Sequence, residues 1–331
     1  MMKKLQIASL VLGLLLFAYL IKQTGLDTLA SYLGLMGWGF AFIIALSCGR
    51  NYIRGASWYF AIEPDHRQIG FFALTNIMLA GEAVKYLTAT GPFLSEPAKA
   101  AMMKRQVPML HGFSSLVVEN MIYYLSVWIF MLSGLPALSW IRDVPDALKL
   151  AGYIGAISII IIVVITYLSI RHRWYPMAHF VELIGRRVAD RRKESFNKVI
   201  NNTRLVEERV YAFYENRRSA FYLILLINMF AHLINVVEVA VILFLMKLPA
   251  DFSVGFVIEA VTKMINMAFF FVPTRAGVYE SGNALVMDAL GFSAAAGLAL
   301  AIVRKIRAFV WVGYGLAIIA LFTIRDRRQQ Q

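Results

Sequence analysis

The chain has 331 residues, 60% of them hydrophobic, with a mean hydropathy of +0.65 and a formal net charge of +13 at pH 7. Ordinary soluble domains are closer to half apolar, and a β-barrel would have short alternating strands instead of apolar runs near the roughly 20 residues that cross a bilayer as a helix. The composition therefore predicts an all-α polytopic membrane protein. Its positive charge is gathered beside apolar runs, which indicates contact with anionic lipid and not with nucleic acid.

The first expected helix covers residues 5–21 and begins on the cytoplasmic side, because Lys3 and Lys4 precede it. Its apolar core is long for a signal peptide, and Lys22 follows where a small-residue cleavage site would lie, so we expect the helix to be retained. Residues 22–34 are nearly neutral and are predicted to form an external loop.

The second expected helix runs inward from Leu35 to Ile62 and carries Arg50 and Arg54. Long arginine side chains extend toward the interface while their stems stay in apolar surroundings. We therefore expect both to reach the inner membrane surface, with the gathering of anionic headgroups as the alternative role. The polar residues 63–68 that follow are expected to be cytoplasmic.

Residues 69–105 are too interrupted to form a spanning helix. The apolar part, 69–81, is short of a bilayer crossing, and it is followed by helix breakers and charges: Glu82, Lys85, Gly91, Pro92, Glu96, Pro97 and Lys99. The segment ends in the cytoplasmic signature Lys104–Arg105, on the side where it entered, which predicts a re-entrant hairpin. Ser95 is a candidate cap and Pro97 suits a first turn, so a helix is expected to start there.

Residues 111–134 and 151–170 are predicted to cross outward and inward, joined by an external loop at 135–150. The region from Arg171 to Arg218 then holds 12 Lys or Arg against 6 Asp or Glu, a cytoplasmic signature. Mostly apolar residues recur in it at helical spacing: Phe196, Val199, Thr203, Val206, Val210 and Phe213. We expect an amphipathic helix lying on the inner surface, with a solvated linker helix as the alternative.

A second interrupted segment follows the outward crossing predicted at 220–246. It starts with a short apolar helix that carries Glu259 and Lys263. The break after this helix contains Pro273, Arg275, Gly277 and Glu280. The last predicted helix, 294–324, carries Arg304 and ends in the basic tail RDRR, which predicts that both termini are cytoplasmic.

The two interrupted segments resemble each other and have opposite orientations. Each contains a proline and then a glutamate and is followed by the tripeptide GFS, at 112–114 and 291–293. The spacing from Glu96 to Asn120 equals that from Glu280 to Arg304, 24 residues. Interrupted segments at corresponding places in inverted halves indicate a transporter-type site near the membrane midplane. We predict about six spanning helices and two re-entrant helical hairpins in an inverted pseudo-repeat. The expected organisation is one transmembrane domain, 1–331, with a first half at 1–170, a cytoplasmic amphipathic linker at 171–219 and a second half at 220–331.

The interrupted segments supply the candidate substrate site. A helix that begins inside the membrane leaves N–H groups unpaired, and these donors and the helix dipole favour an anion such as phosphate. Charges at this depth cost at least about 2.5–3.5 kcal/mol each on insertion scales, so a hydrated cavity between the hairpins explains them better than exposure to lipid. The candidate substrate-binding residues are Glu96, Lys99, Glu119, Lys263, Arg275, Gly277, Glu280 and Arg304.

Within this set, Glu96 and Glu280 lie at the two half-helix starts and are expected to contact a headgroup or to gate the path by binding protons, together with the arginines. The two lysines are expected to neutralise phosphate or to pair with the glutamates. For any single residue the alternative is structural, because prolines and glycines also kink membrane helices and buried ion pairs also act as internal staples.

No cofactor and no metal site are expected. His111 and His232 are isolated in the sequence and are expected to have packing or helix-end roles. Cys48 is the single cysteine, which excludes a disulfide or a thiolate metal site within one chain.

Two motifs carry a resemblance to a known family: GPFLSEPAKAAMMKR and VPTRAGVYESGNALVMDALGFSAAAGLALAIVRKIRAFVWVGYGLAI. Together they resemble the lysylphosphatidylglycerol synthase transmembrane domain, a flippase-like family, over nearly the whole chain. The chain departs from the pattern at Ser95, where the family usually has Gly, and at 274–276, before Gly277. The resemblance implies a lipid flippase-like membrane domain. The best-known members also carry an aminoacyl-transferase domain. The longest polar stretch here is about 50 residues, too small for one, so lysyltransferase activity is not expected.

The sequence thus predicts a transporter of an anionic lipid or a lipid-linked phosphate between leaflets. The expected ligands are an anionic phospholipid or a polyprenyl or glycolipid phosphate, and the expected location is the plasma (inner) membrane, crossed several times. The alternatives are a non-transporting scaffold for a lipid-modifying enzyme and an intramembrane enzyme that modifies lipid. A second copy of the chain and a lipid-synthesising enzyme are the further partners considered.

Overall fold

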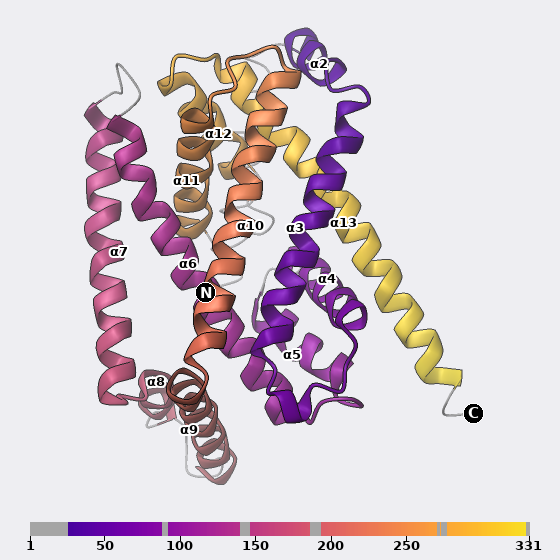
Figure 1. Ribbon diagram of the computed structural model, residues 1–331, viewed down its shortest axis with the longest axis vertical. Coiled ribbons are helices and arrows are strands. Elements are labelled where there is room, and N and C mark those ends of the chain that lie inside the picture. Colours follow the sequence, from indigo (N-terminus) through magenta and orange to yellow (C-terminus); the bar gives the residue numbers. More distant parts are fainter. Residues whose placement is uncertain are drawn as a thin grey trace.

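The apolar runs of the sequence fold into helices, because a helix satisfies its own backbone hydrogen bonds where no water is available. Figure 1 shows a computed structural model of the chain, which describes residues 26–87, 92–139, 146–185, 193–269, 272 and 277–328. Within these ranges every regular element is a helix and no strand occurs. The prediction of an all-α polytopic membrane protein is therefore confirmed.

Long, mostly apolar helices form the frame of the molecule (Figure 1): α3 (Gly39–Ala61), α6 (Met109–Ser139), α7 (Asp146–His172), α10 (Arg218–Leu245) and α13 (Ala294–Arg328). In the part of the chain that the structure describes, three stretches are long and apolar enough to cross a membrane: Met109–Gly134, Arg218–Leu245 and Ala294–Ile324. A shorter apolar stretch, Tyr153–Ile165, lies in α7. The first predicted helix, 5–21, lies outside the described residues.

Two pairs of short helices occur where the sequence predicts re-entrant hairpins: α4 (Phe71–Leu87) with α5 (Pro92–Met103), and α11 (Phe252–Ala268) with α12 (Val278–Ala289). In both pairs the first helix has 17 residues and the second has 12. Figure 1 shows α4 and α5 toward one end of the molecule, and α11 and α12 toward the other. The two pairs therefore enter the bundle from opposite ends.

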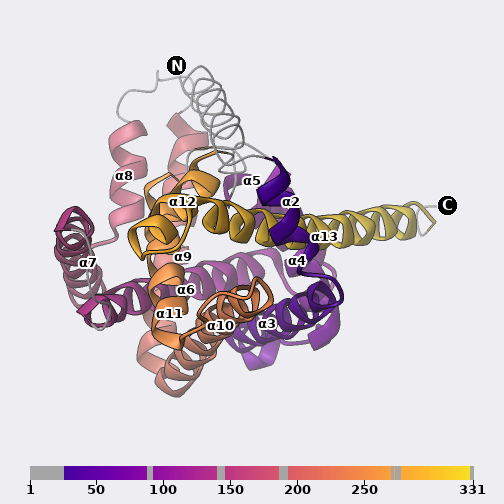
Figure 2. The ribbon, with the colours of Figure 1, turned by 90° about the horizontal axis from the view of Figure 1, so that it is seen from above.

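The packing of the helices follows an inverted pattern of two units, α3–α6 and α10–α13. The first helices of the two units, α3 and α10, pack against each other, and Figure 2 shows them side by side. Each hairpin then contacts the other unit: α4 packs against α13, and α11 packs against α6. In each unit the second hairpin helix packs against the long helix that follows it. Each hairpin is thus an integral part of the bundle, because its first helix packs against a long helix of the opposite unit.

Small residues bring the backbones close where the units cross, as is common between membrane helices. A Cβ added at Gly315 of α13 would lie 2.5 Å from the carbonyl oxygen of Leu79 in α4. In the other crossing, a Cβ added at Gly134 of α6 would lie 2.6 Å from the Cβ of Ala260 in α11. The same device therefore holds both hairpins.

The structure corrects two element predictions. Residues Leu26–Gly34, predicted as loop, form the short helix α2, whose Tyr32 and Leu33 pack on the apolar core beside α13. The helix expected to start at Ser95–Pro97 begins earlier, at Pro92, and Pro97 lies inside α5. The earlier proline is itself suited to a first helical position, where no partner for its missing N–H is needed.

The predicted linker contains α8 (Pro176–Gly185) and α9 (Lys193–Asn216). Helix α9 is amphipathic: Val206, Val210 and Phe213 are buried, whereas Val199 is half exposed. It packs against α6, α8 and α10, at the end of the molecule where α5 lies. A short 3-10 turn, η1 (Pro64–His66), joins α3 to α4 at this same end.

Candidate functional site

Polar residues form a stripe along each of three helices that meet in the bundle. Buried or half-buried positions at helical spacing carry these side chains: Ser47, Asn51, Arg54 and Ser57 on α3; Asn228, His232, Asn235 and Glu238 on α10; and Arg304 and Arg307 on α13. Such residues are costly in contact with lipid, so helices that carry them pack with the stripes facing inward. The stripes meet between α3, α10 and α13, where the two inverted units join.

A cavity of about 210 Å³ opens at this junction. Its charged lining residues are Arg50, Arg54, Glu82 and Arg307. Polar and aromatic groups complete the polar part of the wall: Asn51, Tyr86, Tyr123, His232, Asn235 and Trp311. Helices α3 and α4 of the first unit and α10 and α13 of the second contribute to the wall, so it is a site between the units with an excess of positive charge.

Arg50 is the cation of this cavity that has no carboxylate partner. Its guanidinium donates to the Oδ1 atoms of Asn235, at 2.9 Å, and of Asn51, at 3.0 Å. In the described ranges no carboxylate oxygen lies within 4.0 Å of it. Amide oxygens orient the guanidinium but carry no charge, so Arg50 makes no ion pair of its own, and it shares the cavity wall with two further arginines and a single carboxylate, Glu82. An anion in the cavity would supply the missing charge.

Arg54, one helical turn further along α3, is held by the first unit. It donates to Glu119 Oε1 of α6 at 3.1 Å, and its guanidinium lies 4.0 Å from the ring centre of Tyr123. Glu119 is also within 3.4 Å of Ser57 Oγ, which receives a hydrogen bond from Asn228. The structure departs from the expectation that Arg50 and Arg54 extend to the membrane surface, because both side chains line the cavity, where Arg50 contacts Asn235 of α10 and Arg54 contacts Glu119 of α6.

The second unit has a denser and more deeply buried network. Arg304 of α13 contacts Glu259 of α11 at 2.6 Å and Glu238 of α10 at 3.4 Å. Glu259 also pairs with Lys263 at 2.9 Å, and Glu238 pairs with Arg307. Two carboxylates thus meet three cations, and Arg307 reaches from this network into the cavity wall.

The two networks use equivalent positions with reversed charges. Arg54 lies seven residues before the end of α3, and Glu238 lies seven residues before the end of α10. Their partners, Glu119 and Arg304, each lie ten residues after the first residue of α6 and α13. In each unit an ion pair therefore joins the helix before the hairpin to the helix after it, but the cation and the anion have changed places.

The hairpin residues predicted for the site lie outside the cavity wall. Lys99 of α5 pairs with Glu96 at 3.0 Å and with Glu82 at 3.3 Å, so it joins α5 to α4. Of these three residues, Glu82 lines the cavity. Of the two roles expected for Lys99, neutralising phosphate or pairing with glutamate, the structure has the pairing; the same holds for Lys263.

At the second hairpin, Gly277 and Glu280 build the start of α12. Gly277 has φ +80°, a conformation that favours glycine, and its N–H donates to Glu280 Oε2 at 2.8 Å. The other oxygen of this carboxylate pairs with Lys305 of α13. Glu280 is fully buried and its two oxygens are engaged by protein groups. Arg275 lies outside the described residues.

The structure thus brings Glu119, Arg304 and Lys263 into the two networks beside the cavity, and places Glu96 on α5 and Glu280 on α12, the second helices of the two hairpins. Sequence reasoning did not assign Arg307, Asn235 or Tyr123 to the site: Arg307 was noted only as a charge of the last helix, and Tyr123 only as an interfacial or packing aromatic. A signal for the first two was present: Arg304 and Arg307 share a helical face with Trp311, and Asn235 lies between His232 and Glu238 on a polar stripe.

Comparison with known proteins adds one match. The model of the family described as "Lysylphosphatidylglycerol synthase TM region" matches residues 6–317. Curated proteins and solved structures give no match. The matched range contains both hairpins and every residue of the cavity wall.

Proposed function

The chain belongs to the lysylphosphatidylglycerol synthase TM region family, and on this premise we propose that it moves an anionic lipid, or a lipid-linked phosphate, between the leaflets of the plasma (inner) membrane. The proposed orientation has both termini in the cytoplasm, because the basic segments flank the crossings on that side. The group recognised is the phosphate, which phospholipids and polyprenyl or glycolipid phosphates have in common.

The observation that carries this proposal is the unpaired charge of Arg50 in the cavity between the two units. Phosphate oxygens accept charge-assisted hydrogen bonds from guanidinium groups, and arginine suits this geometry better than lysine. Arg54 and Arg307 face the same space, although each already has a carboxylate partner. A phosphate would compensate Arg50 first and draw on the other two as additional donors.

The size of the cavity fits a headgroup and excludes a whole lipid. Pockets that enclose drug-sized ligands have volumes of about 300–1,000 Å³, and this one has about 210 Å³. The acyl or prenyl chains would remain in the membrane while the phosphate occupies the polar site, so only the headgroup is desolvated during transfer.

The inverted arrangement of the units supports alternating access. In transporters built from inverted repeats, one unit rocks against the other around a site at their interface. Here the cavity has walls from α3, α4, α10 and α13, and the units also cross at the two glycine contacts. A relative rotation of the units would open the cavity to one leaflet and close it to the other.

Reconstitution into liposomes tests the proposal. The purified chain is combined in separate arms with fluorescent phosphatidylglycerol, polyprenyl phosphate and phosphatidylcholine, and lipid in the outer leaflet is quenched by a membrane-impermeant reductant. We expect the chain to accelerate the transfer of one or both anionic lipids, with the zwitterionic lipid slower. Equal rates in protein-containing and protein-free liposomes for every lipid would contradict the proposal.

The same samples separate the alternative functions. An enzyme that modifies lipid would change the mass of the extracted lipid, and a scaffold would change neither the mass nor the leaflet. The family match describes a TM region, and we assign no aminoacyl-transferase activity to the chain.

A further inference from the structure

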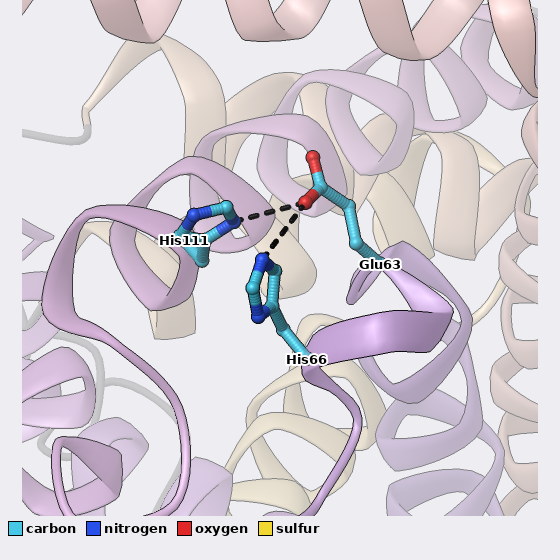
Figure 3. A group of neighbouring side chains, drawn as sticks. All are labelled: Glu63, His66 and His111. Carbon is cyan, nitrogen blue, oxygen red and sulfur yellow. Dashed lines mark hydrogen bonds and ion pairs between the residues drawn. The ribbon is translucent and has the colours of Figure 1, made fainter.

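Three side chains with metal-binding donors meet at the end of the molecule where α3 turns into α4. Glu63 precedes the turn η1, His66 is its last residue, and His111 is the third residue of α6. Glu63 Oε2 lies 2.9 Å from His111 Nδ1 and 3.8 Å from His66 Nε2 (Figure 3). The donor atoms of all three lie within 4.8 Å of one another. None of these residues lines the cavity.

This spacing suits a small metal ion. In a tetrahedral zinc site with metal–ligand bonds of about 2.0–2.1 Å, two donor atoms lie roughly 3.4 Å apart. The two separations from the carboxylate oxygen, 2.9 and 3.8 Å, fall on either side of that value. Small side-chain rotations would therefore bring the three donors around one ion. The side chains are partly exposed, which gives an ion access from solvent.

The donor types narrow the choice of ion. Two imidazole nitrogens and one carboxylate oxygen form a set that zinc uses with a fourth position open to water or another ligand. Imidazole also suits copper, iron and nickel, whereas calcium and magnesium take oxygen donors. Zinc is the ion that this donor set and spacing favour.

Arg209 of α9 competes for the same place. Its guanidinium nitrogen lies 2.9 Å from His111 Nδ1 and 3.3 Å from His111 Nε2. A metal ion on Nδ1 would take the position of this contact and would be repelled by the guanidinium charge. Metal binding therefore requires the Arg209 side chain to move away from His111. The contact between α9 and α6 is then lost, and the metal ion links the α3–α4 turn to α6 instead.

From these contacts we propose that Glu63, His66 and His111 form a zinc site that Arg209 closes when no metal is bound. The site is separate from the cavity and does not depend on lipid transport. It is formed by residues 48 positions apart, Glu63 and His111, which explains why the isolated histidines of the sequence did not indicate it.

Zinc and cobalt binding to the full chain in detergent tests this proposal. We expect one zinc ion per chain in competition with a chromophoric chelator, and a cobalt complex whose visible absorption reports the coordination. His66→Ala and His111→Ala each remove a direct ligand, so affinity should fall by more than the roughly 10–100-fold typical of losing a supporting group. His179→Ala is the matched control, because His179 is exposed on α8 outside the cluster, and it should bind as the unchanged chain does.

Arg209→Gln gives the sharpest result. Because it removes the competing cation and keeps all three ligands, it should bind zinc at least several-fold more tightly than the unchanged chain. Size-exclusion profiles and helical content of each variant show whether it has folded. The proposal is overturned if the folded chain binds no stoichiometric zinc, if His66→Ala and His111→Ala bind as the control does, or if Arg209→Gln weakens binding.

Discussion

The ion-pair networks of the two units occupy equivalent places in the fold and differ in how deeply their side chains are buried. In the second unit Glu238 is fully buried, and each of its two carboxylate oxygens meets an arginine. In the first unit Glu82 has a side chain that is 36% exposed and Arg54 one that is 19% exposed, and both face the cavity. The second network is enclosed within the protein, whereas the first is partly exposed to the cavity.

This difference suggests a division of work within one repeated scaffold. A buried pair contributes little net stability but leaves a large cost when one partner is removed, so the second network braces α10, α11 and α13. The first network sits beside the unpaired Arg50 and can exchange partners with a bound anion. Under the proposed function, the reversed charges at equivalent positions would let the first unit bind the anion while the second unit stabilises the helix packing.

The largest expected effect comes from removing one carboxylate from the buried network of the second unit. Glu238→Gln leaves Arg304 and Arg307 buried with one fewer carboxylate, and the loss of one partner of a buried pair costs about 3–5 kcal/mol. The free energy of unfolding in detergent should fall by about that amount. Glu82→Gln is the control in the cavity wall of the first unit, where the partial exposure of this carboxylate and its pairing with Lys99 should limit the loss to about 1 kcal/mol or less. Similar losses in both variants would remove the distinction between the two networks.

A charge exchange in the first unit sharpens the comparison. Arg54→Glu alone places two carboxylates together and should lower the free energy of unfolding by about 3 kcal/mol or more. Adding Glu119→Arg restores an ion pair with the polarity of the second unit, so most of that loss should be recovered. Transport should stay low in the double variant, because a cation of the cavity wall has become an anion. A double variant that transports normally would show that the polarity of this pair is irrelevant.

A smaller effect is expected where the units cross. Gly315→Ala would put a methyl group against the rigid carbonyl of Leu79, and overpacking of this kind typically costs about 1–3 kcal/mol. Gly134→Ala tests the equivalent crossing of the other hairpin, where the new methyl group meets the side chain of Ala260. Thermal unfolding of both variants in detergent measures the two costs. If neither changes stability, the close helix contacts do not hold the hairpins.

How much of this could be predicted from the sequence depends on how local each feature is. The hairpins could be predicted because their breaks are visible in the sequence: Pro92, Gly277 and the charges near them cannot continue a lipid-exposed helix. The predicted start of α5, at 95–97, is three to five residues too late, because Pro92 and Pro97 are both suited to a first helical turn. Helix α2 was missed because a nine-residue helix has too few apolar residues for a clear periodicity.

The cavity could not be predicted because it depends on contacts between helices far apart in the chain. Arg50 meets Asn235 across 185 residues, and no periodicity within α3 indicates which helix lies opposite. Glu96, Glu280 and Gly277 stood out because they lie at visible breaks, and the structure gives them contacts that hold the hairpins. Polar stripes on three helices would have been the better guide to the cavity.

The most direct test of the account is the transport rate of Arg50→Gln in liposomes. Glutamine removes the charge of Arg50, which makes no ion pair in the described part of the chain. A lost charge-assisted hydrogen bond of about 1.5–3 kcal/mol corresponds to a rate roughly 10–100-fold lower for an anionic lipid. Stability should change little, since Arg50 is partly exposed and makes no ion pair. Arg173→Gln, which changes an exposed arginine in the turn between α7 and α8, should transport normally. If Arg50→Gln is well folded and moves the anionic lipid as fast as the unchanged chain does, the cavity is not the path of the phosphate.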